Sequence, residues 1–88
     1  MSIGDSFFAI ADPHRRFILE ELRRSSRTVG DLAENLPVSR PAVSQHMKIL
    51  LDANLVSVKT EGTRRIYSLN EAAFMPLTLW LDQFWTGG

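Results

Sequence analysis

The amino-acid sequence predicts a single, mainly α-helical domain that carries one small two-stranded β-hairpin. Apolar side chains recur at helical spacing in several short segments, most of which begin at a capping residue or a proline. Residues 55–60 and 64–69 are instead rich in β-branched and aromatic side chains, as strands are. The order helix, helix, helix-turn-helix, hairpin, helix predicts a winged helix-turn-helix with about five helices and a two-stranded antiparallel wing.

The composition is that of an ordinary globular domain, but a small one. The chain has 88 residues and no cysteine, so neither disulfides nor thiolate metal sites can support the fold. A chain of this length buries only about 60–65% of the surface that its unfolded form exposes, and burial against a second copy would enlarge so small a core. The sequence shows no secretory signal and no apolar run of the length that spans a membrane, so we expect a cytoplasmic protein without membrane insertion.

Charge is unevenly distributed along the chain. Residues 1–37 hold five basic and six acidic side chains, a net of −1, and residues 69–88 hold two acidic side chains, a net of −2. Residues 38–68 hold five basic and two acidic side chains, a net of +3. A basic middle between acidic ends indicates a localised anion-binding face, although a chance excess on solvated faces would give the same counts.

Start signals define the helices before the hairpin. A short helix over about residues 4–11 ends before Asp12, which can cap the next helix with Pro13 at its first position. Residues 28–31 (TVGD) resemble a capping box that opens a further short helix, which Pro37 stops. Only Pro37 and Val38 then separate that helix from Ser39, so the two helices are expected to cross steeply, as in a helix-turn-helix.

The helix that begins at Ser39 has one apolar stripe and one polar face. Val43, Met47 and Leu50 lie within about 40° of one another around the helix axis and form the expected buried stripe. The opposite face lacks the i,i+4 Glu–Lys pairs of a merely solvated helix and carries side chains that meet base edges and phosphates. It lies in the part of the helix that helix-turn-helix proteins insert into the major groove. The predicted DNA-binding residues are Ser39, Arg40, Pro41, Ser44, Gln45, His46 and Lys48.

Two of these residues have a structural alternative. Pro41 can act simply as a helix starter, or it can present an apolar surface to a thymine methyl group. His46 falls at the border of the core, where bonding to a backbone or phosphate oxygen competes with reading a base.

The hairpin adds a second basic surface. Glu61 and Gly62 are expected to form its two-residue turn, with Gly62 supplying the positive φ. Side chains alternate across a strand, so only one of Arg64 and Arg65 can share a face with Lys59. Arginine on a solvated hairpin is the structural alternative to contacts with the DNA backbone or minor groove, which would add affinity more than sequence choice. The predicted wing contacts are Lys59, Thr63, Arg64 and Arg65.

The terminal helices carry more aromatic surface than one small core readily covers. The last helix is expected over about residues 76–86, after a turn at residues 71–74 with Asn70 as a possible cap. Adjacent aromatic residues on a helix point about 100° apart, so Phe7-Phe8 and Phe84-Trp85 each face two directions. Either these helices wrap their own domain or they pack against a second copy around a twofold axis. The predicted dimer interface comprises Phe7, Phe8, Leu77, Trp80, Leu81, Phe84 and Trp85.

Two segments resemble the ArsR-type winged-helix repressors. They are AIADPHRRFIL near the N-terminus and TVGDLAENLPVSRPAVSQHMKILLDANLVSVKTEGTRRIYSLN over the helix-turn-helix and wing. The resemblance covers roughly residues 8–85 and is greatest to the short SdpR-like autorepressor branch. It implies a homodimeric transcriptional repressor that dimerises through its first and last helices.

The sequence also departs from part of that family. Metal-sensing members carry a cysteine motif in the first helix of the helix-turn-helix, or a set of Asp, His and Glu ligands in the last helix. Here the first of these helices reads VGDLAENL and the last offers only Asp82. The two histidines, His14 and His46, are too few for a site and lie on different elements, so we expect neither a metal site nor a cofactor.

These observations predict a sequence-specific DNA-binding repressor that acts as a homodimer on a palindromic operator. The expected partners are double-stranded DNA and a second copy of the chain, with an unidentified protein that relieves repression as a further candidate. The alternative is a winged-helix module that holds a protein partner, which the zero net charge favours. No set of nucleophile, base and acid and no phosphate-cradling loop is present in the sequence, so we do not expect an enzyme.

Overall fold

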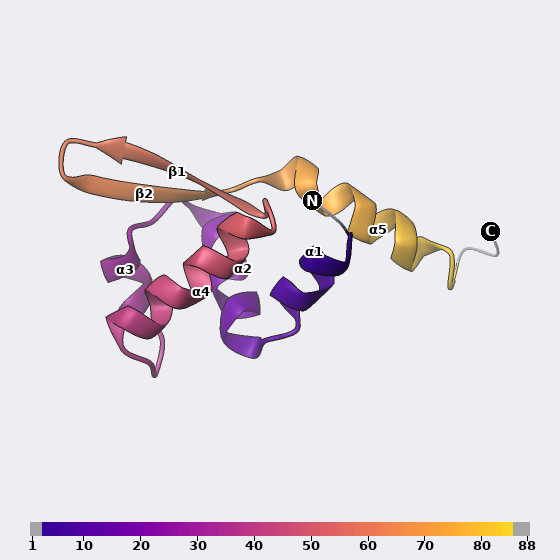
Figure 1. The fold of residues 1–88 in the computed structure, drawn as a ribbon, viewed down its shortest axis with the longest axis horizontal. Coiled ribbons are helices and arrows are strands. Elements are labelled where there is room, and N and C mark those ends of the chain that lie inside the picture. The colour runs from indigo at the N-terminus through magenta and orange to yellow at the C-terminus, as the bar shows by residue number, and fades with distance from the viewer. Residues whose placement is uncertain (1–2, 86–88) are drawn as a thin grey trace.

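The structure, a computed structural model, describes residues 3–85 and has the predicted winged helix-turn-helix architecture (Figure 1). Its elements are α1 (Ile3–Ile10), α2 (Pro13–Arg24), α3 (Val29–Ala33), α4 (Arg40–Asp52), β1 (Val56–Glu61), β2 (Arg64–Leu69), the 3-10 helix η1 (Glu71–Phe74) and α5 (Met75–Asp82). The molecule is elongated, with extents of 48 × 26 × 22 Å. The hairpin tip lies at one end of the long axis, and α5 points away from the body at the other.

The core lies where α2, α3, α4 and the start of the hairpin meet. Ile18, Leu32, Met47 and Leu55, one from each of these regions, are at most 1% exposed. Burial of a large aliphatic side chain contributes about 1.5–3 kcal/mol relative to leaving it in water. The apolar stripes of short helices therefore hold the domain together, as their spacing predicts. No helix within residues 3–85 is both long enough and apolar enough to cross a lipid bilayer.

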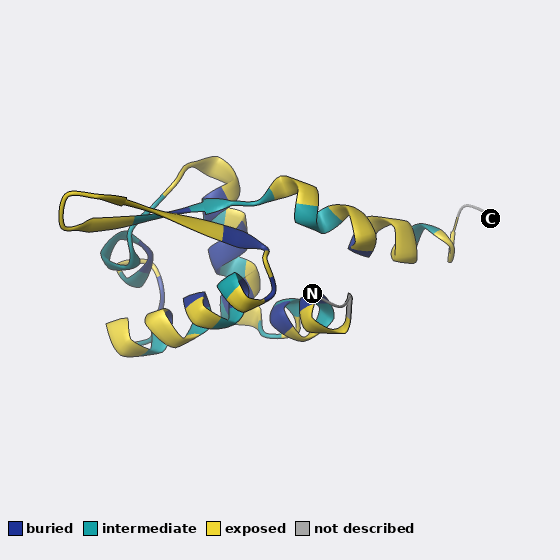
Figure 2. Ribbon diagram, turned by 45° about the horizontal axis from the view of Figure 1, so that its top comes forward, coloured by how far each residue is buried: buried dark blue, intermediate teal, exposed yellow. Residues whose placement is uncertain are grey.

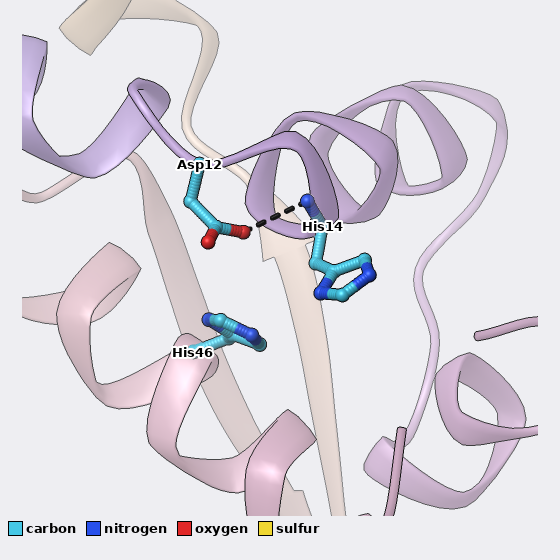
Figure 3. Close-up of side chains that lie close together, drawn as sticks. All are labelled: Asp12, His14 and His46. Carbon is cyan, nitrogen blue, oxygen red and sulfur yellow. Dashed lines mark hydrogen bonds between the residues drawn. The ribbon is translucent and has the colours of Figure 1, made fainter. Parts of the chain in front are cut away.

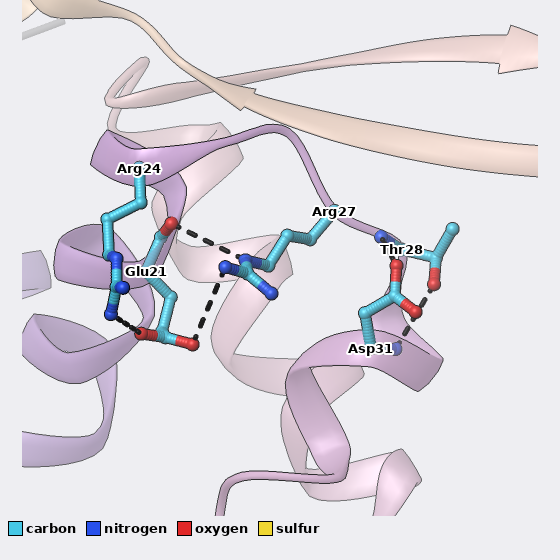
Figure 4. Close-up of polar contacts among 5 residues, drawn as sticks. All are labelled: Glu21, Arg24, Arg27, Thr28 and Asp31. Atoms are coloured by element: carbon cyan, nitrogen blue, oxygen red, sulfur yellow. Dashed lines mark hydrogen bonds and ion pairs between the residues drawn. The ribbon is translucent and has the colours of Figure 1, made fainter.

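Two predicted helix starts have the expected hydrogen bonds. Asp12 caps α2, and one of its carboxylate oxygens accepts from the backbone N–H groups of His14 (2.8 Å) and Arg15 (3.1 Å). Thr28 and Asp31 form a complete capping box at α3, in which each side chain accepts from the backbone N–H of the other (3.1 and 3.0 Å; Figure 4). The hydrogen bonds from Thr28 lower the pKa of Asp31, because they stabilise its carboxylate.

The connection inside the helix-turn-helix is longer than the sequence predicts. Helix α3 ends at Ala33 rather than continuing to Pro37, and residues 34–39 lead to α4. The N–H groups of Asn35 and Leu36 bond to carbonyls three residues back (3.2 and 3.4 Å), which tightens the chain into turns. Leu36 nevertheless keeps its place in the core, at 9% exposure.

The hairpin turn lies one residue further along than predicted. Glu61 pairs with Arg64, so the two residues left in the turn are Gly62 and Thr63 rather than Glu61 and Gly62. Gly62 does supply the positive φ, at 62°, as the first residue of the turn.

A backbone pair outside the hairpin joins the wing to the helices. Arg27 and Tyr67 exchange both backbone hydrogen bonds (2.9 and 2.8 Å) as an isolated antiparallel bridge. Beside this bridge, the Glu21 carboxylate lies 3.8 Å from Arg24 and 3.9 Å from Arg27 (Figure 4). The segment between α2 and α3 thus holds the hairpin against the body.

The C-terminal segment also differs in detail from the prediction. Residues 71–74 form the expected turn, but α5 begins one residue before Pro76 and ends at Asp82. Asn70 does not cap this region, since its side chain donates to the Asn54 carbonyl (2.8 Å). Residues 86–88, which include Gly87 and Gly88, lie outside the described residues.

The capping box generates a stability prediction. Thr28→Ala should lower the free energy of unfolding by about 1 kcal/mol, because an N-terminal N–H of α3 loses its acceptor. Ser44→Ala, an exposed position inside α4, serves as the control and should change it by less than about 0.5 kcal/mol. Urea denaturation followed by circular dichroism measures both, and equal effects of the two variants would contradict the role of the cap.

Candidate nucleic-acid interface

Helix α4 is fixed by one buried stripe and presents its other side to solvent. Val43, Met47 and Leu50 are all 0% exposed. The predicted DNA-binding residues opposite the stripe are exposed: Ser39, Arg40, Pro41, Ser44, Gln45 and Lys48. Figure 2 shows this alternation of buried and exposed positions along the helix.

The first residues on the exposed face of α4 also have structural roles. Ser39 is the N-cap, and its hydroxyl accepts from the Ala42 N–H at 3.3 Å. Pro41 is the second residue of the helix, where the missing N–H costs nothing. The helix-starter interpretation of Pro41 therefore accounts for its position without DNA.

His46 lies apart from the exposed face, half-buried against α2. Its Nδ1 is 3.2 Å from Nη1 of Arg15, whose side chain is 7% exposed. Burial lowers the pKa of His46 and the Arg15 charge lowers it further, while Asp12 opposes both effects. The lowered pKa favours the neutral ring, whose Nδ1 can accept a hydrogen bond from Arg15. His46 therefore lies at the core border as predicted, but its partner is Arg15 rather than the predicted backbone or phosphate oxygen.

The wing arginines divide between its two faces, as the alternation predicts. Arg64 pairs with Glu61 and shares a face with Lys59, whose ammonium lies 3.7 Å from the Glu61 carboxylate. Arg65 lies on the other face, with its guanidinium 5.6 Å from the ring centre of Tyr67.

A surface hollow of about 750 Å³ separates α4 from the wing and brings residues of both together. Among the described residues, four cations and one acid line it. The predicted DNA-binding residues in its lining are Arg40, Ser44, Lys48, Thr63, Arg64 and Arg65. The other predicted contacts, Ser39, Pro41, Gln45, His46 and Lys59, are not part of this lining.

Gly30 of α3 also lines the hollow, although no pattern in the sequence marks it as a binding residue. A Cβ at this position would lie 2.7 Å from Nη2 of Arg40. The Arg40 guanidinium therefore packs directly over the backbone of α3, which ties the cation at the start of α4 to the neighbouring helix.

The sequence predicts that the basic residues on the polar face of α4 have no acidic partner, and this prediction is wrong for Lys48. Lys48 lies 3.6 Å from Asp52, four residues on, and the two side chains are 72% and 71% exposed. An exposed i,i+4 pair contributes at most about 0.5 kcal/mol and is screened by salt. Lys48 can therefore exchange this partner for a phosphate at little cost.

The two histidines lie on different elements, as the sequence indicates, but close together in space. Asp12, His14 and His46 each offer a ligand atom within 4.8 Å of the others (Figure 3). The packing of α2 against α4 brings them together, so their separate elements alone do not rule out a shared site.

The residues of the predicted dimer interface differ in exposure. Phe8, Phe84 and Trp85 are 63%, 64% and 66% exposed, whereas Leu77 is 4% exposed and lies in the core of its own chain. Trp80 packs edge-on against Phe7 and Phe84, at 5.0 and 4.7 Å between ring centres. The sequence reasoning missed two further exposed apolar residues of α5, Met75 and Leu79.

Comparison with known proteins identifies the family. Residues 12–58 match the family described as "Bacterial regulatory protein, arsR family". The HTH-type transcriptional regulator Rv2034 of Mycobacterium tuberculosis is 51% identical over 78 residues, which cover 89% of this chain and 73% of that protein. The transcriptional repressor SdpR of Bacillus subtilis is 38% identical over 82 residues, which cover 93% of this chain and 91% of that protein.

A solved structure agrees with these relatives. The crystal structure of a possible transcriptional regulator for arsenical resistance superposes with a TM-score of 0.84 at 36% identity. The match covers 92% of this chain and 84% of that one. The chain therefore belongs to the arsR family of bacterial regulatory proteins and is a winged-helix transcriptional regulator rather than an enzyme.

Proposed function

We propose that the chain is a sequence-specific DNA-binding repressor that acts as a homodimer on a palindromic operator. The observation that carries the proposal is the hollow in which cations of α4 and the wing converge beside the exposed face of α4. Such a surface suits a duplex backbone on both sides of a groove. The similar protein SdpR is named as a transcriptional repressor, which supports repression over activation. As a bacterial repressor the protein would act in the cytoplasm.

The proposal divides the contacts into two classes. Ser44 and Gln45 are exposed on the N-terminal half of α4 and are suited to base edges, glutamine to adenine in particular. The cations Arg40, Lys48, Arg64 and Arg65 would neutralise phosphates, which sets affinity and register. Lys59 and Thr63 would extend these contacts along the wing, while Ser39, Pro41 and His46 mainly position the helix.

The homodimer is proposed from the surface of the terminal helices. Leu77 faces the core, while Leu79, Phe84 and Trp85 on other sides of α5 and its end are at least 63% exposed. A helix that is apolar all round is normally buried, yet α5 points away from the body (Figure 2). Phe8 extends the same kind of surface onto α1. Twofold packing of α1 and α5 against their copies would cover it.

DNA binding in this proposal needs no metal and no cofactor, since the cations of the hollow supply the charge. The repressor proposal is also compatible with a further protein that relieves repression. The alternative, a winged helix that holds a protein instead of DNA, rests on the zero net charge. Only the repressor function requires DNA binding that weakens as the salt concentration rises, so the salt dependence of DNA binding distinguishes the two functions.

Gln45→Ala should separate specific from non-specific binding. Loss of a bidentate base contact should weaken binding to the operator by about 1–3 kcal/mol and leave binding to random-sequence duplex unchanged. Fluorescence anisotropy with the two duplexes at one fixed salt concentration measures both. An equal loss on both duplexes would show that Gln45 does not read sequence.

Arg64→Ala should weaken binding to all sequences alike, because a phosphate contact carries no sequence information. The slope of log K against log salt concentration should become shallower by about 1. Titrations over a range of salt concentrations test this for both proteins. An absence of salt dependence in the unmodified protein would favour the protein-binding alternative.

Phe84→Glu should convert the dimer into a monomer, since it places a charge in the proposed apolar interface. Gln83→Glu adds the same charge at the neighbouring exposed position and should leave the dimer intact. Sedimentation equilibrium distinguishes the two states. A monomeric unmodified protein, or a Phe84→Glu variant that remains dimeric, would contradict the interface.

A further inference from the structure

The cluster of Asp12, His14 and His46 joins the start of α2 to the recognition helix. Asp12 is the N-cap of α2, His14 is the second residue of that helix, and His46 lies in the middle of α4. Their ligand atoms lie within 4.8 Å of one another, and all three residues are half-buried. Figure 3 shows the His46 ring directed across the gap between the helices toward the Asp12 carboxylate and the His14 ring.

We propose that these three residues form a binding site for one divalent transition-metal ion of the zinc type. Two imidazole nitrogens and one carboxylate oxygen make a donor set that zinc accepts, with water as the fourth ligand. The absence of sulfur ligands disfavours Cu(I), and the two nitrogen donors disfavour Mg²⁺ and Ca²⁺. Metal binding here is independent of the repressor function proposed above.

Each residue keeps a donor atom available. Both capping hydrogen bonds to Asp12 end on Oδ1, at 2.8 and 3.1 Å, so Oδ2 can bind a metal while the cap stays in place. These bonds also orient the carboxylate, as partners of metal ligands commonly do. The contact of His46 with Arg15 involves Nδ1, which leaves Nε2 available on the other side of the ring.

Only small movements are needed to close the site. Zinc–ligand bonds of about 2.0–2.2 Å place tetrahedral ligand atoms about 3.3–3.5 Å apart. The present separations, up to 4.8 Å, exceed this by little more than 1 Å. His14 stands at the half-exposed start of α2, where rotation of its side chain can supply the difference.

The charge of Arg15 opposes the metal but does not block it. A metal on Nε2 of His46 leaves the ring proton on Nδ1, so Nδ1 can no longer accept from Arg15. The guanidinium keeps its two other hydrogen bonds, from Nε to the Ala9 carbonyl (2.7 Å) and from Nη2 to the Phe8 carbonyl (3.1 Å), while Nη1 gives up its contact with the ring.

The test uses the protein without a histidine tag and Co²⁺ as a spectroscopic probe. We expect one Co²⁺ per chain, with the intense visible absorption of a tetrahedral site, and its displacement by Zn²⁺. His14→Gln and Asp12→Asn should each weaken Co²⁺ binding at least about 10-fold, since each removes a ligand. Asparagine preserves the helix cap, so the Asp12 variant should remain folded.

Glu20→Gln, which removes an exposed carboxylate elsewhere on α2, is the matched control and should leave the affinity unchanged. Absence of saturable Co²⁺ binding in the unmodified protein would overturn the site. So would binding that survives either ligand substitution in a protein whose circular dichroism is unaltered. His14→Gln should bind DNA normally without metal, so failure of this site and failure of the repressor proposal are distinguishable.

Discussion

The burial of one stripe of α4 is the constraint on which the rest of the structure depends. With Val43, Met47 and Leu50 fully removed from solvent, the helix has one rotational setting about its axis, and its polar side chains must point outward. Any rotation would expose apolar surface at about 25 cal/mol per Å². The capping box of α3 and the bridge between Arg27 and Tyr67 then place α3 and the wing beside that polar face, where residues of both line one hollow with α4. The buried stripe of α4, the capping box and the backbone bridge together therefore produce the hollow between α4 and the wing.

The small size of the core explains the rest of the architecture. A chain of 88 residues cannot cover every apolar face, and α5 therefore extends from the body with aromatic side chains in solvent. In this small core a single buried cation, Arg15, links three helices. Arg15 belongs to α2, donates to two carbonyls at the C-terminal end of α1, where the helix dipole is negative, and contacts His46 of α4. Helix α1, which is proposed to take part in dimerisation, and helix α4, which is proposed to recognise DNA, thus contact the same buried cation.

Local signals in the sequence predicted the elements, and long-range contacts account for what it missed. The cap at Asp12, the capping box at Thr28 and the stripe of α4 involve residues at most seven positions apart, so their patterns suffice. The position of the hairpin turn depends on the register of the strands, which composition does not predict. The early end of α3 depends on turn hydrogen bonds that compete with the helix, and composition does not predict these either. The meeting of His14 with His46 requires the packing of α2 on α4, which spacing along the chain does not reveal. Leu77 fits a helical apolar pattern equally well as core or interface, and only the fold shows that it is buried.

Selection of bound fragments from a pool of random duplex DNA tests the central claim most directly. If exposed side chains of α4 read bases in each copy of a twofold dimer, the enriched fragments should contain two inverted half-sites. Their centres should lie about 34–36 Å apart, one turn of the double helix, or a multiple of that distance. A pool that remains random after repeated rounds, or a motif with a single unrepeated half-site, would contradict this account.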